Sequence, residues 1–338
     1  MSFSEILGHE RQIAVIRRNA VTGQMPPAYL FHGEEGIGKR MIAMELAKAV
    51  NCTGEHEPGD SCGVCQDCRN IVSGCHPNIS VMALEANPDT GKMRQAITVD
   101  QVRAAQDYLS LKAVGEGRKI LIVDGAHLMN EEAKNAFLKT LEEPPEMSHV
   151  VLVTSRPGSL LATILSRCRA VSFQPLKEGL VAKLLAERAG MDPAEALFVA
   201  GMTGGRVGEA LSADPADLAE RRRYVMDVFE FLPGSSYSGA VKKAEEVSKK
   251  EGGLEDLAFF GTLWFRDLLV ILLGGDEALA YNRDMGAGLQ ACASRMTAYR
   301  CEEAIGLLKD TGRALERTYN RRLLAEDLFF RLKEETLA

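Results

Sequence analysis

Seven residues near the N-terminus have the types and spacing of a phosphate-binding loop. The segment Gly33–Lys39 reads GEEGIGK, follows a short apolar run and opens a helical pattern, so it matches G-x-x-x-x-G-K. Gly33, Gly36 and Gly38 would let backbone N–H groups surround phosphates, and the helix N-terminus behind them favours an anion. Lys39 would reach the terminal phosphates. A glycine-rich turn without a ligand is the weaker alternative in this strand–loop–helix context.

The residues that would complete a hydrolytic site are of the wrong types. Arg40 stands where a hydrolysing loop has a Ser or Thr hydroxyl for Mg²⁺, and a guanidinium has no acceptor atom for a cation. Asp124 ends the apolar run KILIVD, where a metal-holding aspartate is expected, although a turn or helix-capping role is the alternative. Gly125 replaces the water-activating Glu. We therefore expect no ATP hydrolysis, and passive binding of ATP or phosphate stays open.

Four cysteines in one polar stretch have the spacing of zinc ligands. They follow the pattern C-x₉-C-x₂-C-x₂-C, and they are Cys52, Cys62, Cys65 and Cys68. Tight C-x₂-C turns suit a tetrahedral Zn²⁺ with four sulfur ligands. Residues 52–75 have little apolar content for a core, so a metal would supply their order. Unliganded reduced cysteines are the less favoured alternative, and three further side chains remain open as ligands: Cys75, His56 and His76.

One arginine lies in a short motif before the last strand pattern. Ser166-Arg167-Cys168 follows LLATIL and precedes the apolar residues near 170. The tripeptide by itself does not distinguish Arg167 from a surface arginine that pairs with a carboxylate.

The elements that must position these residues form an α/β pattern. Nearly continuous apolar runs such as KILIVD and HVVLVT suit strands that are covered on both faces, as in a parallel sheet. Helical patterns at 39–50, 102–111 and 131–142 lie between the strands. The predicted strands are Tyr29–His32, Ile79–Leu84, Ile120–Asp124, Val150–Thr154 and Ala170–Phe173.

The sequence changes character after Phe173. Residues 176–211 have short helical patterns around a glycine-rich turn, and nearly everything after Pro215 has helical periodicity. We therefore expect three domains. They are an α/β nucleotide-binding-like domain over 1–174 with the zinc module at 52–75, a small helical domain over 175–212, and an all-α domain over 213–338.

Composition narrows the class of protein. The chain has 338 residues, 46% apolar and 26% charged, with a net charge of −7. Proteins that bind nucleic acid tightly on their own usually have a basic face, which this balance does not favour. The start of the chain has no secretory pattern, and the longest apolar run, Leu268–Leu273, is far too short to span a membrane. We expect a cytoplasmic protein with no membrane partner.

Together these motifs resemble the AAA+ clamp-loader subunits of bacterial DNA polymerase III, and among them the delta-prime group. The resemblance rests on FSEILGHERQIAVIRRNAVTGQMPPAYLFHGEEGIGK, the four-cysteine insertion, ILIVDGAHLMNEEAKNAFLKTLEEPP and LLATILSRC. It covers Phe3 to about Phe173 closely. It continues more loosely through WFRDLLV and LAEDLFFRL, which are similar to the family's helical collar domain; residues 175–212 would be the family's lid.

The resemblance implies a subunit of a hetero-pentamer with motor (tau/gamma) and delta subunits, which opens the sliding clamp and closes it around primed DNA. In that family the arginine of the SRC motif reaches a neighbouring subunit's ATP, and Arg167 matches that arginine. Thr154 falls near the family's sensor 1 position. The sensor 2 arginine of the motor subunits is replaced by Gly208. With Arg40 and Gly125, three hydrolytic elements are absent, as in the non-hydrolysing delta-prime subunit.

Two other hypotheses compete with this one. The first is an active clamp-loader ATPase of the tau/gamma type with an unusual Mg²⁺ arrangement, and Arg40, Gly125 and Gly208 argue against it. The second is an unrelated zinc-containing P-loop NTPase that shares only the fold.

Overall fold

The apolar runs of the first half form one five-stranded sheet. The computed structural model describes residues 2–86, 91–315 and 320–336, and its strand order is β2-β3-β4-β1-β5 with every neighbouring pair parallel. The predicted parallel α/β fold is therefore confirmed. The strands are β1 (Ala28–His32), β2 (Ile79–Met82), β3 (Lys119–Asp124), β4 (Ser148–Thr154) and β5 (Arg169–Ser172).

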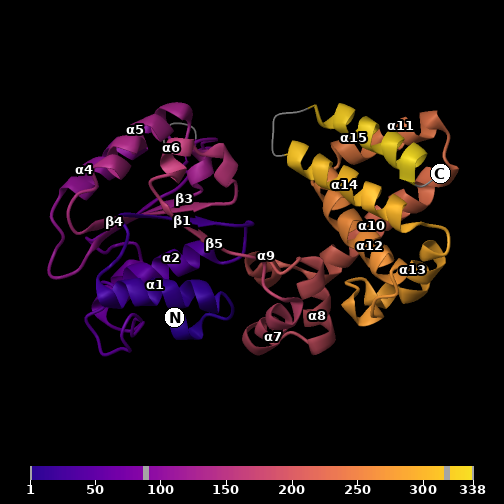
Figure 1. The fold of residues 1–338 in the computed structure, drawn as a ribbon. Coiled ribbons are helices and arrows are strands. Elements are labelled where there is room, and N and C mark those ends of the chain that lie inside the picture. The colour runs from indigo at the N-terminus through magenta and orange to yellow at the C-terminus, as the bar shows by residue number, and fades with distance from the viewer. Residues whose placement is uncertain (1, 87–90, 316–319, 337–338) are drawn as a thin grey trace. The chain divides into compact units, whose positions relative to one another are not determined.

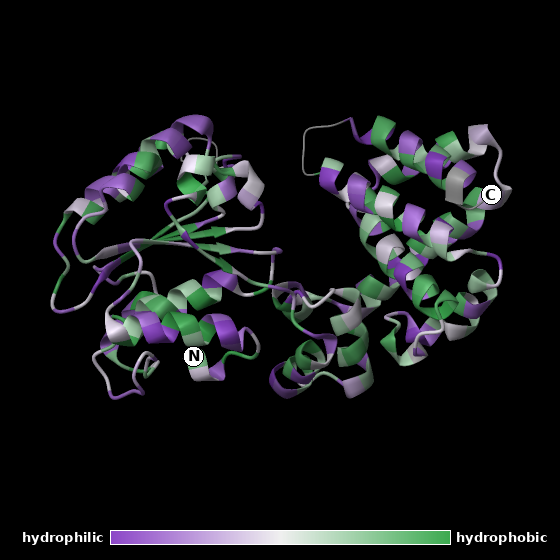
Figure 2. Ribbon diagram, in the orientation of Figure 1, coloured by the Kyte–Doolittle hydropathy of each residue, from purple (hydrophilic) through white to green (hydrophobic). Residues whose placement is uncertain are grey.

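Helices cover both faces of this sheet (Figure 1). One layer contains α1 (Glu10–Thr22), α2 (Lys39–Ala49) and α3 (Gln66–Val72), and the other contains α4 (Val99–Ser110), α5 (Glu131–Glu142) and α6 (Ala162–Leu165). Successive strand residues point to opposite layers, so Ile120 and Ile122 pack with the first layer and Leu121 and Val123 with the second. This explains why the middle of the sheet is largely apolar, as the green strand segments of Figure 2 show.

The described residues divide into two compact units. The first unit, residues 1–190 and 204–211, holds the sheet and its helices, and the second unit comprises residues 191–203 and 212–338. Besides the sheet and its six helices, the first unit contains η1 (Phe3–Glu5), η2 (Ala126–Leu128), η3 (Pro157–Ser159), α7 (Glu178–Ala189) and most of α9 (Val207–Ser212). The division into three domains at 174 and 212 stays a prediction.

The second unit is helical throughout its described residues. Its elements are α8 (Pro193–Met202), α10 (Pro215–Gly234), α11 (Tyr237–Lys249), α12 (Gly253–Leu272), η4 (Glu277–Leu279), η5 (Arg283–Met285), α13 (Gly286–Ala293), α14 (Ala298–Leu315), α15 (Arg321–Arg331) and the π-helical turn η6 (Leu332–Thr336). Helix α12 packs against α10, α13 and α14, and α11 packs against α15. The apolar residues of α12 are largely buried in this unit, including Trp264.

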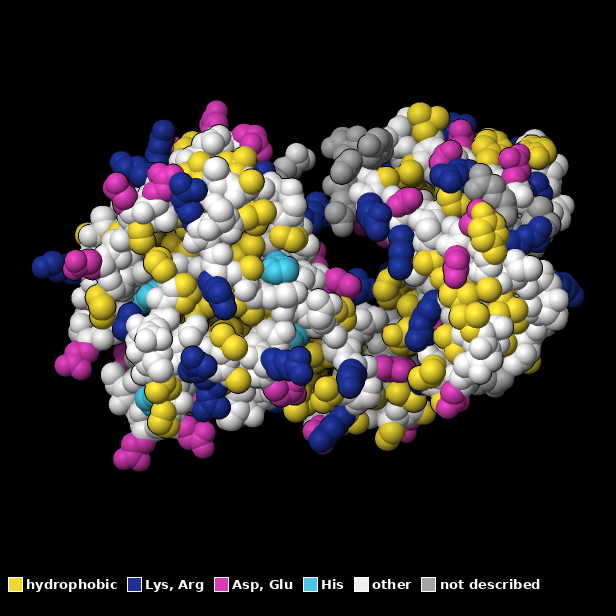
Figure 3. Space-filling view, viewed as in Figure 1, with side chains coloured by type: hydrophobic (Ala, Val, Ile, Leu, Met, Phe, Trp, Pro, Cys, Tyr) yellow, Lys and Arg dark blue, Asp and Glu magenta, His cyan; other side chains and the backbone are white. Residues whose placement is uncertain are grey.

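Charged side chains of both signs are scattered over the surface of each unit in the face that Figure 3 shows. None of the described helices combines the length and the apolar composition that crossing a bilayer requires.

Candidate functional site

The phosphate-loop sequence forms a tight loop between β1 and α2, at the carboxyl edge of the sheet. Gly33, Gly36 and Gly38 have φ values of 144°, 74° and 93°, which side chains rarely tolerate. A Cβ on Gly33 would also lie 2.3 Å from the Phe173 carbonyl oxygen. These glycines are therefore required by the backbone path, and parallel α/β sheets bind ligands at this edge.

Lys39 lies folded against its own loop. Its Nζ donates to the carbonyl oxygen of Gly33 at 2.7 Å and to that of Glu34, and the residue is only 6% exposed. Burial lowers the pKa of Lys39, while the nearby carboxylates of Glu35 and Asp124 act in the opposite direction. The Lys39 ammonium is thus buried and bound to neutral carbonyl oxygens. A charged phosphate oxygen would form a stronger hydrogen bond with it than these carbonyl oxygens do.

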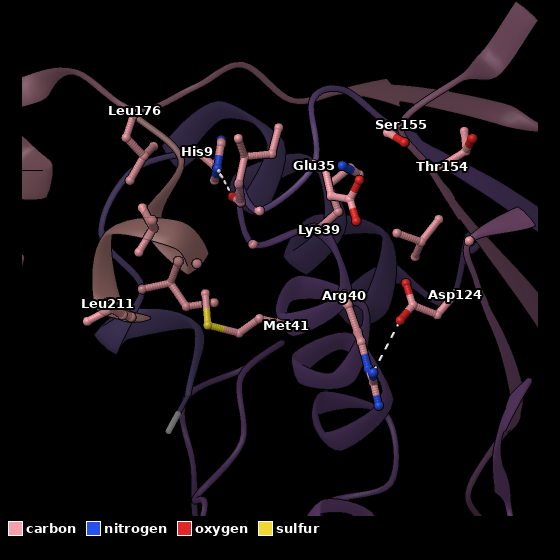
Figure 4. A pocket seen from close by; sticks show the side chains of 18 of the residues that line it. His9, Glu35, Lys39, Arg40, Met41, Asp124, Thr154, Ser155, Leu176 and Leu211 are labelled. Carbon is pink, nitrogen blue, oxygen red and sulfur yellow. Dashed lines mark hydrogen bonds and ion pairs between the residues drawn. The ribbon is translucent and has the colours of Figure 1, made fainter. Parts of the chain in front are cut away.

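Arg40 pairs with the carboxylate that was expected to hold a metal. Its Nη1 lies 3.2 Å from Oδ2 of Asp124, at the end of β3, and Figure 4 shows the two side chains facing each other. In hydrolysing P-loop proteins a Ser or Thr hydroxyl and an Asp carboxylate at these two positions hold Mg²⁺. Because Arg40 offers no oxygen and its charge occupies Asp124, these residues do not fit the Mg²⁺ ion of a hydrolysing P-loop site.

At the end of β3, the position expected to carry a water-activating carboxylate is occupied by Gly125. Gly125 has φ 74° and begins η2, so no side chain projects from that position. Thr154 ends β4 and is 1% exposed. Its Oγ1 lies 3.2 Å from Nδ1 of His127 and accepts a hydrogen bond from the Arg156 backbone N–H at 3.0 Å. Thr154 and His127 are therefore placed to orient a ligand, and Gly125 supplies no carboxylate to this part of the pocket.

The N-terminus of α9 packs directly on the phosphate loop. The backbone N–H of Gly208 donates to the carbonyl oxygen of Gly36 at 2.7 Å. A Cβ on Gly208 would lie 3.1 Å from that oxygen and 3.3 Å from the Gly36 Cα. The backbone contact therefore occupies the space that a side chain at position 208 would need.

These elements enclose a pocket of about 570 Å³. Of the predicted nucleotide-binding residues, six line it: Gly36, Gly38, Lys39, Arg40, Asp124 and Thr154. Gly33 lies outside the lining, against Phe173. Figure 4 shows Asp124, Thr154 and Ser155 on one side of Lys39, and Met41, Leu176 and Leu211 on the other. The side with Leu176 and Leu211 is mainly apolar, although His9 also lies there, and the lining further includes Glu5 and Arg188.

Sequence reasoning missed His9 in this pocket. It precedes α1 with φ 60°, its Nε2 lies 3.0 Å from the carbonyl oxygen of Ile37, and its ring packs edge-on against Phe173 at 5.1 Å. Burial lowers its pKa, so the neutral ring donates to the loop carbonyl. The available signal was a histidine directly after Gly8, because His enters the left-handed region more readily than most residues.

The four predicted metal-ligand cysteines come together at a second place in the first unit. The sulfur atoms of Cys52, Cys62, Cys65 and Cys68 all lie within 4.8 Å of one another. The Sγ atom of Cys52 is 3.5 Å from that of Cys62 and 3.8 Å from that of Cys65. Four thiolates around a zinc at about 2.3 Å would lie about 3.8 Å apart. The cluster therefore has the dimensions of a tetrahedral metal site.

Backbone N–H groups favour the thiolate forms of Cys62 and Cys65, whereas burial raises the pKa of Cys52 and of Cys68. The Cys65 N–H points to Sγ of Cys62 at 3.2 Å, and the Cys68 N–H to Sγ of Cys65 at 3.4 Å. Donation from Val64 and Cys65 lowers the pKa of Cys62. Burial raises the pKa of Cys65, but N–H donation led by Cys68 outweighs it and lowers the value to about 6. These contacts are typical of thiolate ligands.

The three alternative ligands lie outside this four-sulfur cluster. The Cys75 thiol is exposed and contacts the Ser73 carbonyl oxygen at 3.6 Å. His76 is buried, and its Nε2 lies 3.4 Å from Oδ1 of Asp67. His56 Nδ1 contacts the Gly54 carbonyl oxygen at 2.6 Å.

Arg167 lies away from the pocket, between α6 and β5. Its Nη2 donates to Oε1 of Glu142 at 2.7 Å, its Nη1 donates to the Thr163 carbonyl oxygen at 3.0 Å, and its side chain is 35% exposed. Glu142 ends α5. Within this chain, Arg167 therefore behaves as a surface arginine with a carboxylate partner.

Comparisons with known proteins agree on one family. Residues 8–177 match the family described as "DNA polymerase III, delta subunit". The DNA polymerase III subunit delta' of Bacillus subtilis is 32% identical over 316 residues, which are 91% of this chain and 91% of that protein.

Two further relatives cover this chain differently. The tau subunit of DNA polymerase III from Bacillus subtilis is 34% identical over 173 residues, but this chain spans only 29% of its length. Among solved structures, a DNA polymerase III gamma subunit-related protein from Thermotoga maritima is 19% identical and covers 96% of this chain and 99% of its own, with a TM-score of 0.42.

Proposed function

The chain belongs to the DNA polymerase III delta family and matches a delta' subunit along nearly its whole length, and from this premise we propose that it is a non-hydrolysing clamp-loader subunit. In this proposal it joins motor (tau/gamma) and delta subunits in a hetero-pentamer of AAA+ proteins. That complex opens the sliding clamp and closes it around primed DNA. The family relationship also excludes an unrelated zinc-containing P-loop NTPase.

The observation that carries the non-hydrolysing role is the ion pair between Arg40 and Asp124, at 3.2 Å. In a hydrolysing P-loop a hydroxyl and a free carboxylate hold Mg²⁺. Here Arg40 supplies no hydroxyl, and its guanidinium engages the carboxylate of Asp124. Gly125 and Gly208 add two further losses at the same pocket. An active ATPase of the tau/gamma type is the alternative, supported by the 34% identity to a tau subunit but opposed by these three positions.

A subunit that does not hydrolyse ATP still contributes to hydrolysis if it completes a neighbour's site. In this proposal Arg167 serves as an arginine finger in trans. A guanidinium suits that role because it stays charged and donates to two phosphate oxygens at once. Its pair with Glu142 is partly exposed, so releasing it costs at most about 1 kcal/mol. Phosphate oxygens are therefore able to replace Glu142 as the partner.

The remaining parts receive supporting roles in the same proposal. The four-cysteine cluster holds one Zn²⁺ ion, which orders residues 52–75. Residues 213–338, which include α12 and α15, form the collar through which the subunits assemble.

The direct test is ATP turnover by the isolated chain and by the reconstituted complex. The isolated chain should show no Mg²⁺-dependent turnover, and Lys39→Ala should change nothing. Motor and delta subunits should hydrolyse ATP and load clamps efficiently only when this chain is added. Turnover by the isolated chain that disappears in Lys39→Ala would instead establish the active ATPase.

A further inference from the structure

The side chain of Arg40 places a positive charge 3.2 Å from the carboxylate of Asp124, and an aspartate at this position helps to hold Mg²⁺ in hydrolysing P-loop proteins. From this geometry we infer that the pocket binds a nucleoside polyphosphate without a divalent cation, with the Arg40 guanidinium in the place of Mg²⁺. The inference shares with the proposed function the assignment of residues 33–39 as a phosphate loop, but it concerns binding by the isolated chain.

Anion binding rests on groups that the loop already presents. The first turn of α2 has N–H groups without partners inside the helix, and they open toward the loop. Lys39 Nζ is held beside them by carbonyl oxygens of the same loop. A phosphate in the loop would exchange these neutral partners for a charged one, which strengthens the hydrogen bonds of a buried ammonium.

Arg40 supplies the second cation. Its contact with Asp124 uses Nη1, while the guanidinium has five N–H donors in a planar fork. The remaining donors are able to bind phosphate oxygens while Asp124 fixes the orientation of the group. Asp124 thus orients the guanidinium of Arg40, a cation that belongs to the protein itself, where an aspartate of a hydrolysing P-loop site would orient a metal ion.

The same charge disfavours a metal-bound ligand. Mg²⁺ near Asp124 would compete with a guanidinium 3.2 Å away and would meet its positive charge. Nucleotide complexed with Mg²⁺ also carries less negative charge than free nucleotide, so the cations Lys39 and Arg40 attract it less. Added Mg²⁺ should therefore weaken binding or leave it unchanged.

The other side of the pocket indicates why the ligand is a nucleoside rather than phosphate alone. Apolar side chains line the pocket beyond the loop, namely Ile6, Leu7, Met41, Leu176, Leu184 and Leu211. Figure 4 shows three of these, Met41, Leu176 and Leu211, across Lys39 from Asp124. The volume of about 570 Å³ lies in the range of small-molecule sites. In this inference a planar base packs against these apolar side chains while its phosphates bind the loop.

The test is binding of mant-ADP to the full chain, in EDTA and with excess Mg²⁺, with unlabelled ADP and pyrophosphate as competitors. Wild type should bind in EDTA, Mg²⁺ should not strengthen binding, and ADP should compete better than pyrophosphate.

Lys39→Ala should weaken binding at least about tenfold, the scale of a lost charge-assisted hydrogen bond. Arg40→Ser should weaken binding in EDTA by a similar factor and make binding Mg²⁺-dependent, because it frees Asp124 and adds a hydroxyl.

Controls separate this inference from folding and from the proposed function. Arg103→Ser changes an exposed arginine of α4 outside the pocket and should bind like wild type. Thermal melting checks that each variant folds. If Arg40→Ser does not fold, Arg40→Gln, which also lacks the positive charge, is tested in its place. The inference is overturned if wild type needs Mg²⁺, if it binds in neither condition, or if Arg40→Ser responds to Mg²⁺ as wild type does. None of these outcomes bears on turnover by the complex.

Discussion

Arg167 shows how one residue serves its own chain and, in the proposal, a neighbour. Within its own chain its guanidinium donates to Glu142 and to the Thr163 carbonyl oxygen. The pair with Glu142 is partly exposed, so its release in favour of a neighbour's phosphate costs at most about 1 kcal/mol. The ion pair is therefore compatible with a role in trans, and mutation distinguishes the two.

Arg167→Ala should lower ATP turnover and clamp loading by the reconstituted complex, while folding and zinc content stay intact. A finger contributes roughly 10³–10⁵ in rate at the site it completes, whereas an exposed pair is worth at most about 1 kcal/mol of stability. Arg167→Lys should restore little of the lost ATP turnover, because an ammonium lacks the planar geometry that lets a guanidinium donate to two oxygens side by side.

The matched control for this prediction is Glu142→Gln, which breaks the same ion pair but keeps the guanidinium. It should leave turnover near wild type. If Arg167→Ala loads clamps as well as wild type, Arg167 is only a surface arginine. If Glu142→Gln is as defective as Arg167→Ala, the pair itself is what matters.

His9 gives the first unit a pH dependence with a definite sign. Burial lowers its pKa below the usual value of about 6.5, and burial does the same for His149. The unfolded chain therefore binds protons that the folded chain does not, so stability is fully present above about pH 6.5 and falls as the pH drops toward the folded pKa.

We accordingly expect denaturant unfolding to show lower stability at about pH 5.5 than at about pH 7.5. His9→Asn should flatten this dependence, since Asn tolerates the left-handed backbone but does not titrate. His56→Asn changes an exposed histidine and should keep the wild-type profile. An unchanged slope in His9→Asn would mean that His9 does not contribute.

At the scale of elements, the cysteine module supports more than its own loop. Asp60 of this module is 4% exposed and accepts hydrogen bonds from the backbone N–H groups of Phe3 at 2.8 Å and Ser4 at 3.2 Å. These residues begin η1, and Glu5 of η1 lies at the pocket. Through these hydrogen bonds, ordered residues 52–75 help to hold the start of the chain in place.

Cys65→Ser should therefore release the metal and loosen two segments. Elemental analysis should give about one zinc per wild-type chain and almost none in the variant. Limited proteolysis should cut residues 53–75 faster, and hydrogen exchange near η1 should rise. Cys75→Ser, which changes an exposed cysteine outside the cluster, should retain zinc and wild-type protection. The zinc site would be contradicted if purified wild-type protein held no metal and Cys65→Ser left the protease resistance of residues 53–75 unchanged.

At the scale of the whole molecule, each compact unit has its own core and its own buried polar anchor. In the second unit, Asp267 is fully buried in α12. Its carboxylate accepts hydrogen bonds from the backbone N–H groups of Tyr281 at 3.0 Å and Asn282 at 2.8 Å, from Nδ2 of Asn282 at 2.8 Å, and from Arg266. It ties the segment before α13 to the centre of that unit.

Asp267→Ala should destabilise the second unit by about 3 kcal/mol, because buried N–H groups lose their acceptor. Hydrogen exchange should increase across α12 and residues 280–285, while β1, β3 and β4 keep their protection. Asp310→Ala removes only an exposed pair with Arg313 and should cost no more than about 1 kcal/mol. Equal loss of protection in both units would show that they unfold as one.

The sequence alone determined the parts of this protein that depend on local patterns. Apolar runs such as Ile120–Val123 predict strands of a parallel sheet because both of their faces must be covered. The phosphate loop and the cysteine cluster were predictable because their ligand groups lie within a few residues of one another. The residue types at positions 40 and 125 likewise predict the loss of hydrolysis. Arg40 has no side-chain oxygen for Mg²⁺ and Gly125 has no carboxylate to activate water, and this holds wherever the fold places them.

Only the tertiary structure decided which distant groups meet. The contacts of Arg40 with Asp124, Gly208 with Gly36 and His9 with Ile37 each join segments that are far apart in the chain. The pairing of Arg167 with Glu142 is of the same kind. Residue type states what a side chain is able to bind, but sheet order and helix packing determine which partner comes within a few ångströms. Such partners have no periodic pattern in the sequence, so the fold alone selects them.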